Sequence, residues 1–438
     1  MQKCFNFTSL NLKAFLNCGD ERGLSLKAIL VIADGMADRP IKELGWKTPL
    51  EAAVKPNLDR IAKKGVCGII DPIAPGIPPG SDTATLAMLG YDPWKVYSGR
   101  GALEAVGSGV EVLPGDVAFR CNFATVNNDL VVLDRRASRI ANEDATKLAA
   151  SLQRIRLPTS LNVKFLFKNT IQHRAILVLH GPKLSSAISD SDPETTRKKV
   201  LEVKPFERSF EAERTAQIVN MLTKEFHKVL EAHPVNKQRT KRKLPVANMI
   251  LCRGAGGIPK MPTLQERFDI KPACIAAVSL IRGVCEVVGM DLINVRGATG
   301  TPQTDYMAKA KAAVRALKTH DFVLLHVKAT DVASHDGNVK EKIEIVEKID
   351  KMLGYVLDNV DPGFTYIAVT ADHTTSSTTR NHEGDPVPVA IIGSGVRRDD
   401  VTEYGERTCA EGGLNRIRGM DLMPTLMSLI GKAKKFGA

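Results

Sequence analysis

The sequence of 438 residues predicts an α/β protein with a doubly wound, mostly parallel sheet and a smaller inserted α+β domain. Two observations predict this fold. Near both ends of the chain, short apolar runs rich in β-branched residues alternate with amphipathic helical patterns, as in parallel α/β sheets. In the middle of the chain, runs of alternating or mixed character indicate strands with one exposed face.

Three apolar runs of the outer regions share one design, because each is short, β-branched and ends at an aspartate. They are Lys27 to Ala33 before Asp34, Phe322 to Thr330 before Asp331, and Phe364 to Ala371 before Asp372. A fourth run, Val387 to Ile392, ends at Gly393. Helical patterns lie between and after these runs, at residues 305–317, 340–357 and 419–430. Buried parallel strands joined by helices are expected from this alternation.

The middle of the chain predicts a separate unit. Strands are expected in 117–126, 130–134, 164–167, 173–180 and 247–252, with helices at 210–231 and 275–288. We therefore predict an N-terminal extension or added strand (1–25), a discontinuous metal-binding domain (26–114 and 295–438) and an inserted substrate-binding domain (115–294). The segments 113–115 and 294–302 are the expected hinges, because they contain glycine and proline.

The composition indicates an ordinary globular protein, with 43% apolar and 25% charged residues. No apolar run is long enough to cross a bilayer, and the first residues do not have the pattern of a signal peptide. None of the eight cysteines forms a CxxC pair, so we expect reduced, buried thiols. These features predict a cytoplasmic protein without a membrane partner.

The formal charge of +12 is consistent with nucleic acid or with a small anionic substrate. The densest basic run, residues 236–243 (NKQRTKRK), has no interleaved aromatic residue. We interpret it as a solvated connection and expect no nucleic-acid partner.

The aspartates after the three strands predict a metal site, because ligands of open α/β sheets bind beyond the carboxyl ends of the strands. Histidines accompany two of them: His335 follows Asp331 at helical spacing, and His373 follows Asp372 directly. The six candidate ligands are Asp34, Asp331, His335, Asp372, His373 and His382. Such a mixed set is suited to Mn²⁺, Zn²⁺, Co²⁺ or Mg²⁺. Each histidine alone is more often a surface or hydrogen-bonded residue.

Ser81 lies in IPPGSDTATLAMLG, where prolines and a glycine precede a helical pattern. One interpretation is a helix N-cap. The other is a nucleophile, because a helix N-terminus attracts phosphate and a metal-bound serine loses its proton more easily. The pattern alone leaves both interpretations open.

Four segments resemble one family: DGMADRP (34–40), PPGSDTATLAMLGYDP (78–93), KATDVASHDGN (328–338) and TADHTTSSTTRNHEGDPVPV (370–389). They are similar to the archaeal-type 2,3-bisphosphoglycerate-independent phosphoglycerate mutases of the alkaline phosphatase superfamily. The resemblance runs from about Leu26 to the C-terminal region. It implies an alkaline-phosphatase-like fold and a glycolytic isomerase.

The resemblance also implies a mechanism. Ser81 would take the phosphoryl group of 3-phosphoglycerate and return it to the other hydroxyl, giving 2-phosphoglycerate without free 2,3-bisphosphoglycerate. Two divalent ions, Mn²⁺ first among the four candidates, would be held by two sets of residues. One set matches Asp34, Ser81, Asp372 and His373, and the other matches Asp331, His335 and His382.

The substrate residues are predicted from charge and position. The inserted domain offers Asp134, Arg135 and Arg136 after one strand, His173 and Arg174 before another, and Arg253 in CRGAGG. Asp134 is a candidate acid/base, and paired surface charges are the alternative interpretation of the two adjacent arginines. Lys328 is expected to meet phosphate or to be a structural lysine with a buried stem.

Other functions predict different properties. A phosphatase or a phosphopentomutase of the same superfamily would share Ser81 and the metal ligands and differ in the insert. A nucleotide-binding protein would depend on the glycine-rich stretches 107–109 and 253–257, which do not complete GxGxxG or GxxxxGK[ST]. A nucleic-acid-binding module would show steeply salt-dependent binding and no metal requirement.

Overall fold

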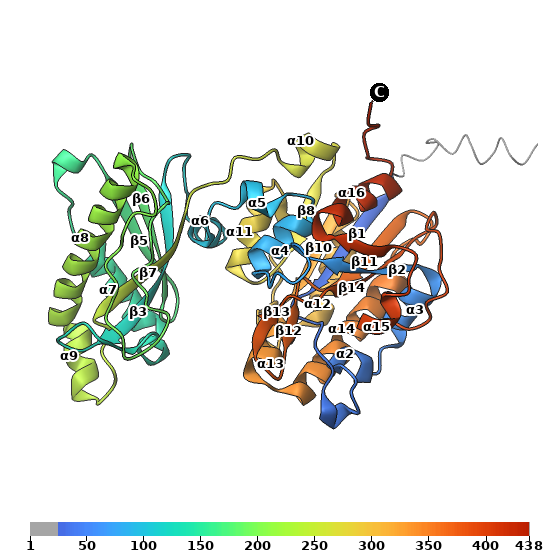
Figure 1. Cartoon of the computed structure of the whole chain (residues 1–438), viewed down its shortest axis with the longest axis horizontal. Coiled ribbons are helices and arrows are strands. Elements are labelled where there is room, and N and C mark those ends of the chain that lie inside the picture. The colour runs from blue at the N-terminus through green and yellow to red at the C-terminus, as the bar shows by residue number, and fades with distance from the viewer. Residues whose placement is uncertain (1–24, 438) are drawn as a thin grey trace, which may run out of the picture.

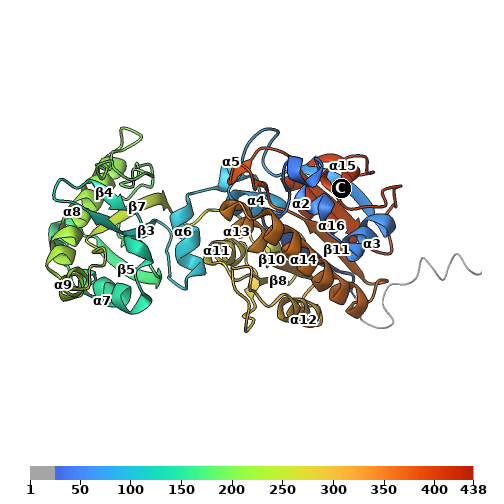
Figure 2. The same cartoon turned by 90° about the horizontal axis from the view of Figure 1, so that it is seen from below.

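The computed structural model describes residues 25–437, which form a larger and a smaller lobe (Figure 1). An eight-stranded sheet forms the centre of the larger lobe, and a five-stranded sheet forms the centre of the smaller lobe. Helix α6 (Arg100–Gly107) lies between the lobes in both views (Figures 1 and 2). The prediction for the N-terminal extension concerns residues that, apart from Ser25, lie outside the described range.

The large sheet has the strand order β15-β2-β14-β11-β1-β10-β8-β9. Its strands are β1 (Lys27–Ala33), β2 (Val66–Asp71), β8 (Pro272–Ile275), β9 (Asp291–Leu292), β10 (Phe322–Val327), β11 (Thr365–Thr370), β14 (Val387–Ile392) and β15 (Asn415–Arg418). All neighbours pair in parallel except β14, which is antiparallel to β11 and β2. The mostly parallel α/β sheet predicted from the sequence is therefore confirmed.

Strand β14 runs against the others because the chain between β11 and β14 contains no crossover helix. It contains a small hairpin, β12 (Thr374–Ser376) and β13 (Asn381–Glu383). A parallel return requires a crossover of a dozen or more residues, usually a helix, whereas an antiparallel return needs only a turn.

Helices flank the large sheet in two groups. Helices α3 (Pro56–Lys64), α12 (Tyr306–Ala316) and α14 (Val339–Asn359) form one group, and α4 (Ser81–Met88), α11 (Ser279–Val287) and α16 (Gly419–Leu429) form the other. Connections between parallel strands are almost always right-handed. Connections that run in opposite directions along the sheet therefore place their helices on opposite faces. Five further helices are α2 (Pro49–Ala52), α5 (Pro93–Val96), α10 (Leu264–Phe268), α13 (Ala329–Asp336) and α15 (Glu406–Cys409).

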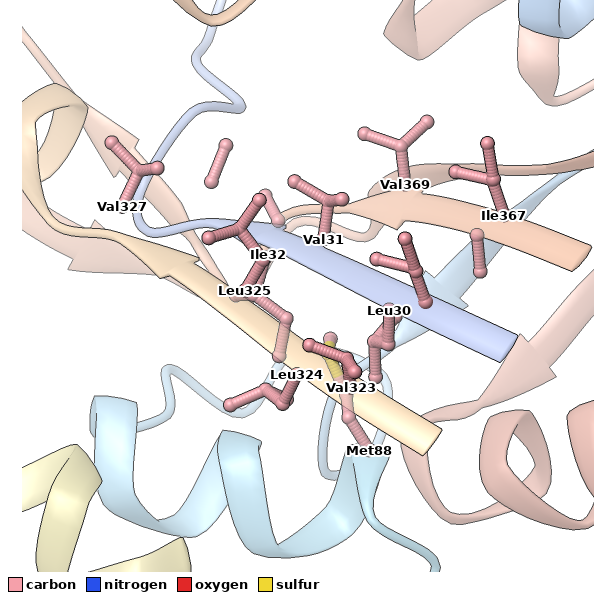
Figure 3. Close-up of a cluster of buried hydrophobic side chains, with 14 of the residues drawn as sticks. Leu30, Val31, Ile32, Met88, Val323, Leu324, Leu325, Val327, Ile367 and Val369 are labelled. Carbon is pink, nitrogen blue, oxygen red and sulfur yellow. The ribbon is translucent and has the colours of Figure 1, made fainter. Parts of the chain in front are cut away.

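The central strands supply the main core. Every residue of Ala28–Ala33 is fully buried, and so are Val323 and Leu324 of β10. Figure 3 shows Met88 of α4 against Val323 and Leu324, so the helix that begins at Ser81 is fixed to the strand that leads to Lys328. Burial of each such side chain stabilises the fold by roughly 1.5–3 kcal/mol.

The small lobe is an antiparallel sheet with helices on one face. Its strands are β3 (Val117–Val126), β4 (Val132–Asp134), β5 (Lys164–Ile171), β6 (Arg174–His180) and β7 (Met249–Gly256), and its helices are α7 (Asn142–Leu152), α8 (Phe210–Ala232) and α9 (Pro234–Lys241). Phe167 packs between Phe123 and Phe226, with ring centroids 5.9 and 5.2 Å away. The aromatic cluster joins the sheet to α8.

The predicted end of the insert at residue 294 disagrees with the sheet membership. Strand β8 pairs in parallel with β10, and β9 pairs with β8, so both belong to the large sheet. The expected hinge at 294–302 consequently lies within the larger lobe. The error arose because no strand was predicted at 272–275, and a short buried segment does not reveal from its sequence which sheet it joins.

The basic run 236–243 is also different from the expected solvated connection. Residues up to Lys241 form helix α9, and Arg239 is buried. The Arg239 guanidinium donates to the carbonyls of Pro245 and Ala137 and pairs with Asp144 at 3.4 Å. Part of this positive charge therefore stabilises the small lobe. Among residues 25–437, no helix combines the length and apolarity that a membrane span requires.

Candidate metal centre

Three neighbouring strands, β11, β1 and β10, end at the same edge of the large sheet because they run in parallel. Asp34 follows β1 directly, and Asp372 and His373 follow β11 within three residues. The predicted strand before Asp331 is shorter than expected, because β10 ends at Val327. Asp331 instead lies in the first turn of α13.

Helix α13 brings Asp331 and His335 to one face, as their spacing predicted for a helical segment. His335 Nε2 lies 3.3 Å from Asp331 Oδ1. The helix ends at Gly337, whose φ of 70° is in the left-handed region that glycine adopts without strain. The short helix therefore presents a carboxylate and an imidazole together.

His382 completes a group that we call the outer site: Asp331, His335 and His382. His382 Nε2 lies 3.3 Å from both Asp331 Oδ1 and His335 Nε2. In both histidines Nδ1 lies 2.7 Å from a backbone carbonyl oxygen. His382 contacts the carbonyl of Pro79, and His335 contacts that of Arg380. A carbonyl only accepts, so each Nδ1 carries the proton and each Nε2 is available as a ligand.

A second group, which we call the inner site, consists of Asp34, Ser81, Asp372 and His373. His373 Nε2 lies 3.1 Å from Ser81 Oγ and 3.4 Å from both Asp34 Oδ1 and Asp372 Oδ2. Ser81 is 6% exposed and the other three are fully buried. Asp34, Asp331 and His373 offer ligand atoms within 4.8 Å of one another, so the two sites adjoin.

The inner site fits a divalent cation. Asp34 Oδ2 and Asp372 Oδ2 are buried and have no hydrogen-bond partner. Burial and the neighbouring charge of Asp34 raise the pKa of Asp372 well above its usual value, and burial lowers the pKa of His373 to about 3. Unpartnered carboxylate oxygens beside a neutral imidazole are suitable oxygen and nitrogen ligands for Mn²⁺, Zn²⁺, Co²⁺ or Mg²⁺.

Lys328 compensates the buried acids. Its Nζ lies 2.9 Å from Asp34 Oδ1, 2.6 Å from Asp331 Oδ2 and 3.3 Å from Ser81 Oγ. Burial opposes the charged forms, yet Lys328 holds the pKa of Asp34 below its usual value and that of Asp331 well below it. Lys328 therefore contacts both sites and the serine.

His326 was not predicted as a site residue from the sequence. It is fully buried in β10, and it shares a possible cation position with Asp34 and Asp372. Its Nε2 is 3.0 Å from Asp34 Oδ2 but is not aligned for a hydrogen bond. The available signal was a histidine within the apolar run FVLLHV, which is costly to bury without a polar partner.

Ser81 occupies the first position of α4, and Gly80 occupies the N-cap position. The Ser81 hydroxyl contacts His373 Nε2 and Lys328 Nζ instead of the amides of its own helix. The cap interpretation therefore does not account for its side chain, which is directed toward the inner site.

A cluster of arginines lies on one face of the small sheet. Arg120 of β3 is opposite Arg253 of β7, and Asn122 of β3 is opposite Arg174 of β6. Residues opposite each other, and residues two apart on one strand, share a face. Arg100 of α6 joins them, and we call Arg100, Arg120, Arg174 and Arg253 the arginine face.

The arginine face has more positive charge than its partners neutralise. Glu104 Oε2 lies 3.3 Å from Arg120 Nε and 3.8 Å from Arg100 Nε. Burial, with Arg100, Arg253 and Arg174, lowers the pKa of Arg120 against the opposing effect of Glu104. Helix α6 packs on this same face, where its Ala102 shares a buried apolar cluster with Ala118 of β3. Because α6 lies between the lobes, the arginine face is on the side of the larger lobe (Figure 2).

The other predicted substrate residues are placed differently. Asp134 accepts hydrogen bonds from the amides of Arg136 and Ser138, and so stabilises the turn that follows it. Arg135 forms a two-pronged pair with the buried Asp192, at 3.0 and 2.7 Å. His173 lies beside the cluster, where burial and the charge of Arg174 lower its pKa to about 4. Arg100 and Arg120 were not predicted.

The fold and the site together define the chain as an α/β protein with a candidate divalent-metal centre at one edge of its mostly parallel sheet. The family model for 2,3-bisphosphoglycerate-independent phosphoglycerate mutase matches residues 62–236, and that for type I phosphodiesterase / nucleotide pyrophosphatase matches residues 266–389. A 2,3-bisphosphoglycerate-independent phosphoglycerate mutase of Methanocaldococcus jannaschii is 49% identical, over 94% of this chain and 99% of its own length.

Two solved structures are also similar. The PH0037 protein from Pyrococcus horikoshii is 40% identical with a TM-score of 0.83, covering 95% of this chain and 100% of that one. A cofactor-independent phosphoglycerate mutase from Thermoplasma acidophilum is 36% identical with a TM-score of 0.69, covering 93% and 100%. The chain thus belongs to the 2,3-bisphosphoglycerate-independent phosphoglycerate mutases, and the family predicted from its motifs is confirmed.

Proposed function

We propose that this chain interconverts 3-phosphoglycerate and 2-phosphoglycerate through a phosphoserine at Ser81. The observation that carries the proposal is the Ser81 hydroxyl, which is buried among the inner-site ligands and contacts Lys328 Nζ at 3.3 Å. A serine placed among carboxylates and imidazoles at a helix N-terminus is suited to phosphoryl transfer. The 49% identity to a named mutase supports the same reaction.

The inner site and the outer site would each hold one divalent cation, with Mn²⁺ as the first candidate. Bound there, the cations would lower the pKa of the serine hydroxyl and offset negative charge on the phosphoryl group. Asp34, Ser81, Asp372 and His373 would hold one ion, and Asp331, His335 and His382 the other. The superfamily and the clustered ligand atoms support divalent metal binding.

In the reaction that we propose, Ser81 Oγ loses its proton and takes the phosphoryl group, the bond from phosphorus to the glycerate oxygen breaks, and that oxygen gains the proton that the serine lost. Lys328 lies beside Ser81 and supplies a positive charge to the transferred group. The glycerate then presents its other hydroxyl to the phosphoserine and receives the group back. No water is consumed in either half, so the net reaction is an isomerisation.

The arginine face would hold the carboxylate of the acid while the phosphoryl group is on Ser81. Arg120, Arg174 and Arg253 are directed to one side of the small sheet. Glu104 pairs with Arg120 at 3.3 Å, and no other acid among residues 25–437 forms an ion pair with these three arginines. Retention of the intermediate distinguishes a mutase from a phosphatase, because water must not reach the phosphoserine first. The proposed role of Arg135 and Asp134 in substrate binding is still a prediction.

The experiment is acid quenching of the enzyme during turnover of phosphoglycerate labelled in its phosphoryl group. The proposal predicts label on Ser81, identified by peptide mass spectrometry, and no label in Ser81→Ala. Turnover by the wild type with label on another residue, or with none at any time point, would reject the phosphoserine. Ser98, a half-buried serine whose hydroxyl donates to the carbonyl of Gly257, is a matched control, and Ser98→Ala should still be labelled.

A further inference from the structure

Thr375, a residue of the hairpin strand β12, has its hydroxyl between the two proposed metal sites. Thr375 Oγ1 lies 2.9 Å from His373 Nδ1 in the inner site, and it donates to Asp331 Oδ1 in the outer site at 3.0 Å. The side chain is fully buried. One hydroxyl therefore contacts one ligand of each site.

The proton positions follow from what each group is able to do. An ionised carboxylate only accepts, so the single Thr375 hydroxyl proton points to Asp331. The same oxygen then has only lone pairs for His373, so the proton between them must be on His373 Nδ1. His373 Nε2 is left with its lone pair facing Ser81 Oγ and the carboxylates of the inner site. A metal-ligating imidazole needs this tautomer.

The backbone around Thr375 is fixed from both sides. The Thr375 amide donates to the carbonyl of Ala37 at 3.0 Å, and its carbonyl accepts from Lys342 Nζ at 2.9 Å. Lys342 is fully buried and also pairs with the buried Asp38 at 2.9 Å. These contacts fix the backbone position of Thr375 beside both sites.

Gly35 supplies the space that the hydroxyl occupies. A Cβ at Gly35 would lie 2.5 Å from Thr375 Oγ1 and 2.9 Å from Asp331 Cβ, and its φ is +64°. Only glycine adopts this conformation there without strain or collision. The amide of Gly35 also donates to Asp372 Oδ1 at 3.0 Å, so the same turn serves the inner site.

We propose that Thr375 is a positioning residue that sets the His373 tautomer and couples the inner site to the outer site. Because Thr375 touches a ligand of each set, its hydroxyl affects the affinity of both sites for a divalent cation without binding either ion. The inference depends on the proposed function, since it assumes that both sites bind metal.

The test is calorimetric titration of Mn²⁺ into metal-free full-length protein. Thr375→Val has nearly the same shape but no hydroxyl, and it should weaken both binding events by roughly 10- to 100-fold, as is typical when a partner of a metal ligand is removed. Thr375→Ser retains the hydroxyl and should stay within about threefold of wild type. Thr374→Val is the matched control, because the buried Thr374 hydroxyl donates to the carbonyl of Asp385 and to no proposed ligand.

The outcomes separate the two proposals. Two Mn²⁺ ions bound equally by wild type and Thr375→Val would overturn the role of Thr375 and leave the proposed function standing. Wild type that binds no Mn²⁺ would overturn both. Weakening of one site alone would overturn the coupling.

A measurement on the wild type covers the case in which Thr375→Val does not fold. Nitrogen chemical shifts of the histidine rings in metal-free protein report which ring nitrogen carries the proton. The His373 signals, assigned by their loss in His373→Asn, should show a protonated Nδ1 and an unprotonated Nε2. The opposite tautomer would overturn the proposal.

Discussion

The metal centre at the edge of the large sheet and the arginine face of the small sheet bury opposite charges in different ways. At the edge, Asp34 directly follows β1 and Asp372 lies two residues after β11. Lys328 pairs with Asp34 and Asp331. On the arginine face, Arg120 and Arg253 meet only because two antiparallel strands pair in one register. Short sequence motifs determine the first arrangement, whereas the second depends on pairing between segments about 130 residues apart.

This contrast implies different sensitivities. The edge should carry the chemical step, and its loss should abolish turnover. The arginine face should retain the acid, and its loss should weaken turnover and release phosphate. Variants of the two regions therefore distinguish these two roles.

Ser81→Ala should reduce kcat by at least about 10⁴-fold, because removal of a nucleophile removes the covalent route. The fold should survive, since the Ser81 hydroxyl makes no bond to the amides of its own helix. Steady-state kinetics with thermal unfolding checks both statements. A variant that keeps more than a few per cent of wild-type kcat would show that the serine is not the acceptor.

Exhaustive chelation should lower activity by roughly 10³-fold, because metal stabilisation of a transferring phosphoryl group is worth several kcal/mol. Addition of Mn²⁺ should restore it, and titration of the restored activity against Mn²⁺ gives the number of ions required. Activity that persists in the chelated protein, with metal absence verified by elemental analysis, would reject both proposed sites.

Arg253→Ala should lower kcat/KM by roughly 10- to 150-fold, because a charge-assisted hydrogen bond is worth about 1.5–3 kcal/mol. It should also raise the ratio of free phosphate to product, since the acid escapes before the return transfer. An unchanged kcat/KM and an unchanged product ratio would show that Arg253 does not help to retain the acid.

Arg135→Ala separates a structural arginine from a substrate arginine. Asp192 is 2% exposed and would lose its two-pronged partner, so the free energy of unfolding should fall by about 1–3 kcal/mol. If Arg135 serves only this pair, kcat/KM should change by less than about threefold. A large loss of kcat/KM with unchanged stability would restore its predicted role in substrate binding.

The pH dependence of stability should reveal the buried His373 in metal-free protein. Burial lowers its pKa in the folded state to about 3, whereas an unfolded histidine titrates near 6.5. Below pH 6.5 the unfolded chain therefore binds a proton that the folded chain does not bind, and stability falls as pH falls. This group alone contributes about 1.4 kcal/mol per pH unit.

Urea unfolding at several pH values between 7 and 5, with chelator present, measures this slope. His373→Asn should show a shallower slope than wild type, because the titrating group is gone. Equal slopes in the two proteins would mean that His373 does not remain neutral in the folded state.

The comparison also shows how far the sequence could predict the molecule. Strand β1 was predicted with its observed bounds, because a buried parallel strand is a short, continuous apolar run before a polar residue. Asp331 was assigned to a strand end and lies in α13, yet its i, i+4 pairing with His335 was predicted because that relation depends only on helical geometry. Local patterns therefore predicted the edge of the large sheet well.

Long-range pairing limited the rest. Arg120 was missed because nothing in VAFRCNFATV reveals that Arg253 will lie opposite it. Residues 272–292 were assigned to the insert, because their sequence does not show that a strand there pairs with β10. Thr375 and Lys342 were not singled out, since their importance depends on contacts with Asp331, His373 and Asp38. Such residues become visible only when the strands and hairpin are placed in space.

The most direct test of the central claim is incubation of the Mn²⁺-loaded protein with 3-phosphoglycerate, with 2-phosphoglycerate and free phosphate followed in the same sample. We expect 2-phosphoglycerate to accumulate to equilibrium while free phosphate stays near background, without added 2,3-bisphosphoglycerate. Release of phosphate without formation of 2-phosphoglycerate would contradict it.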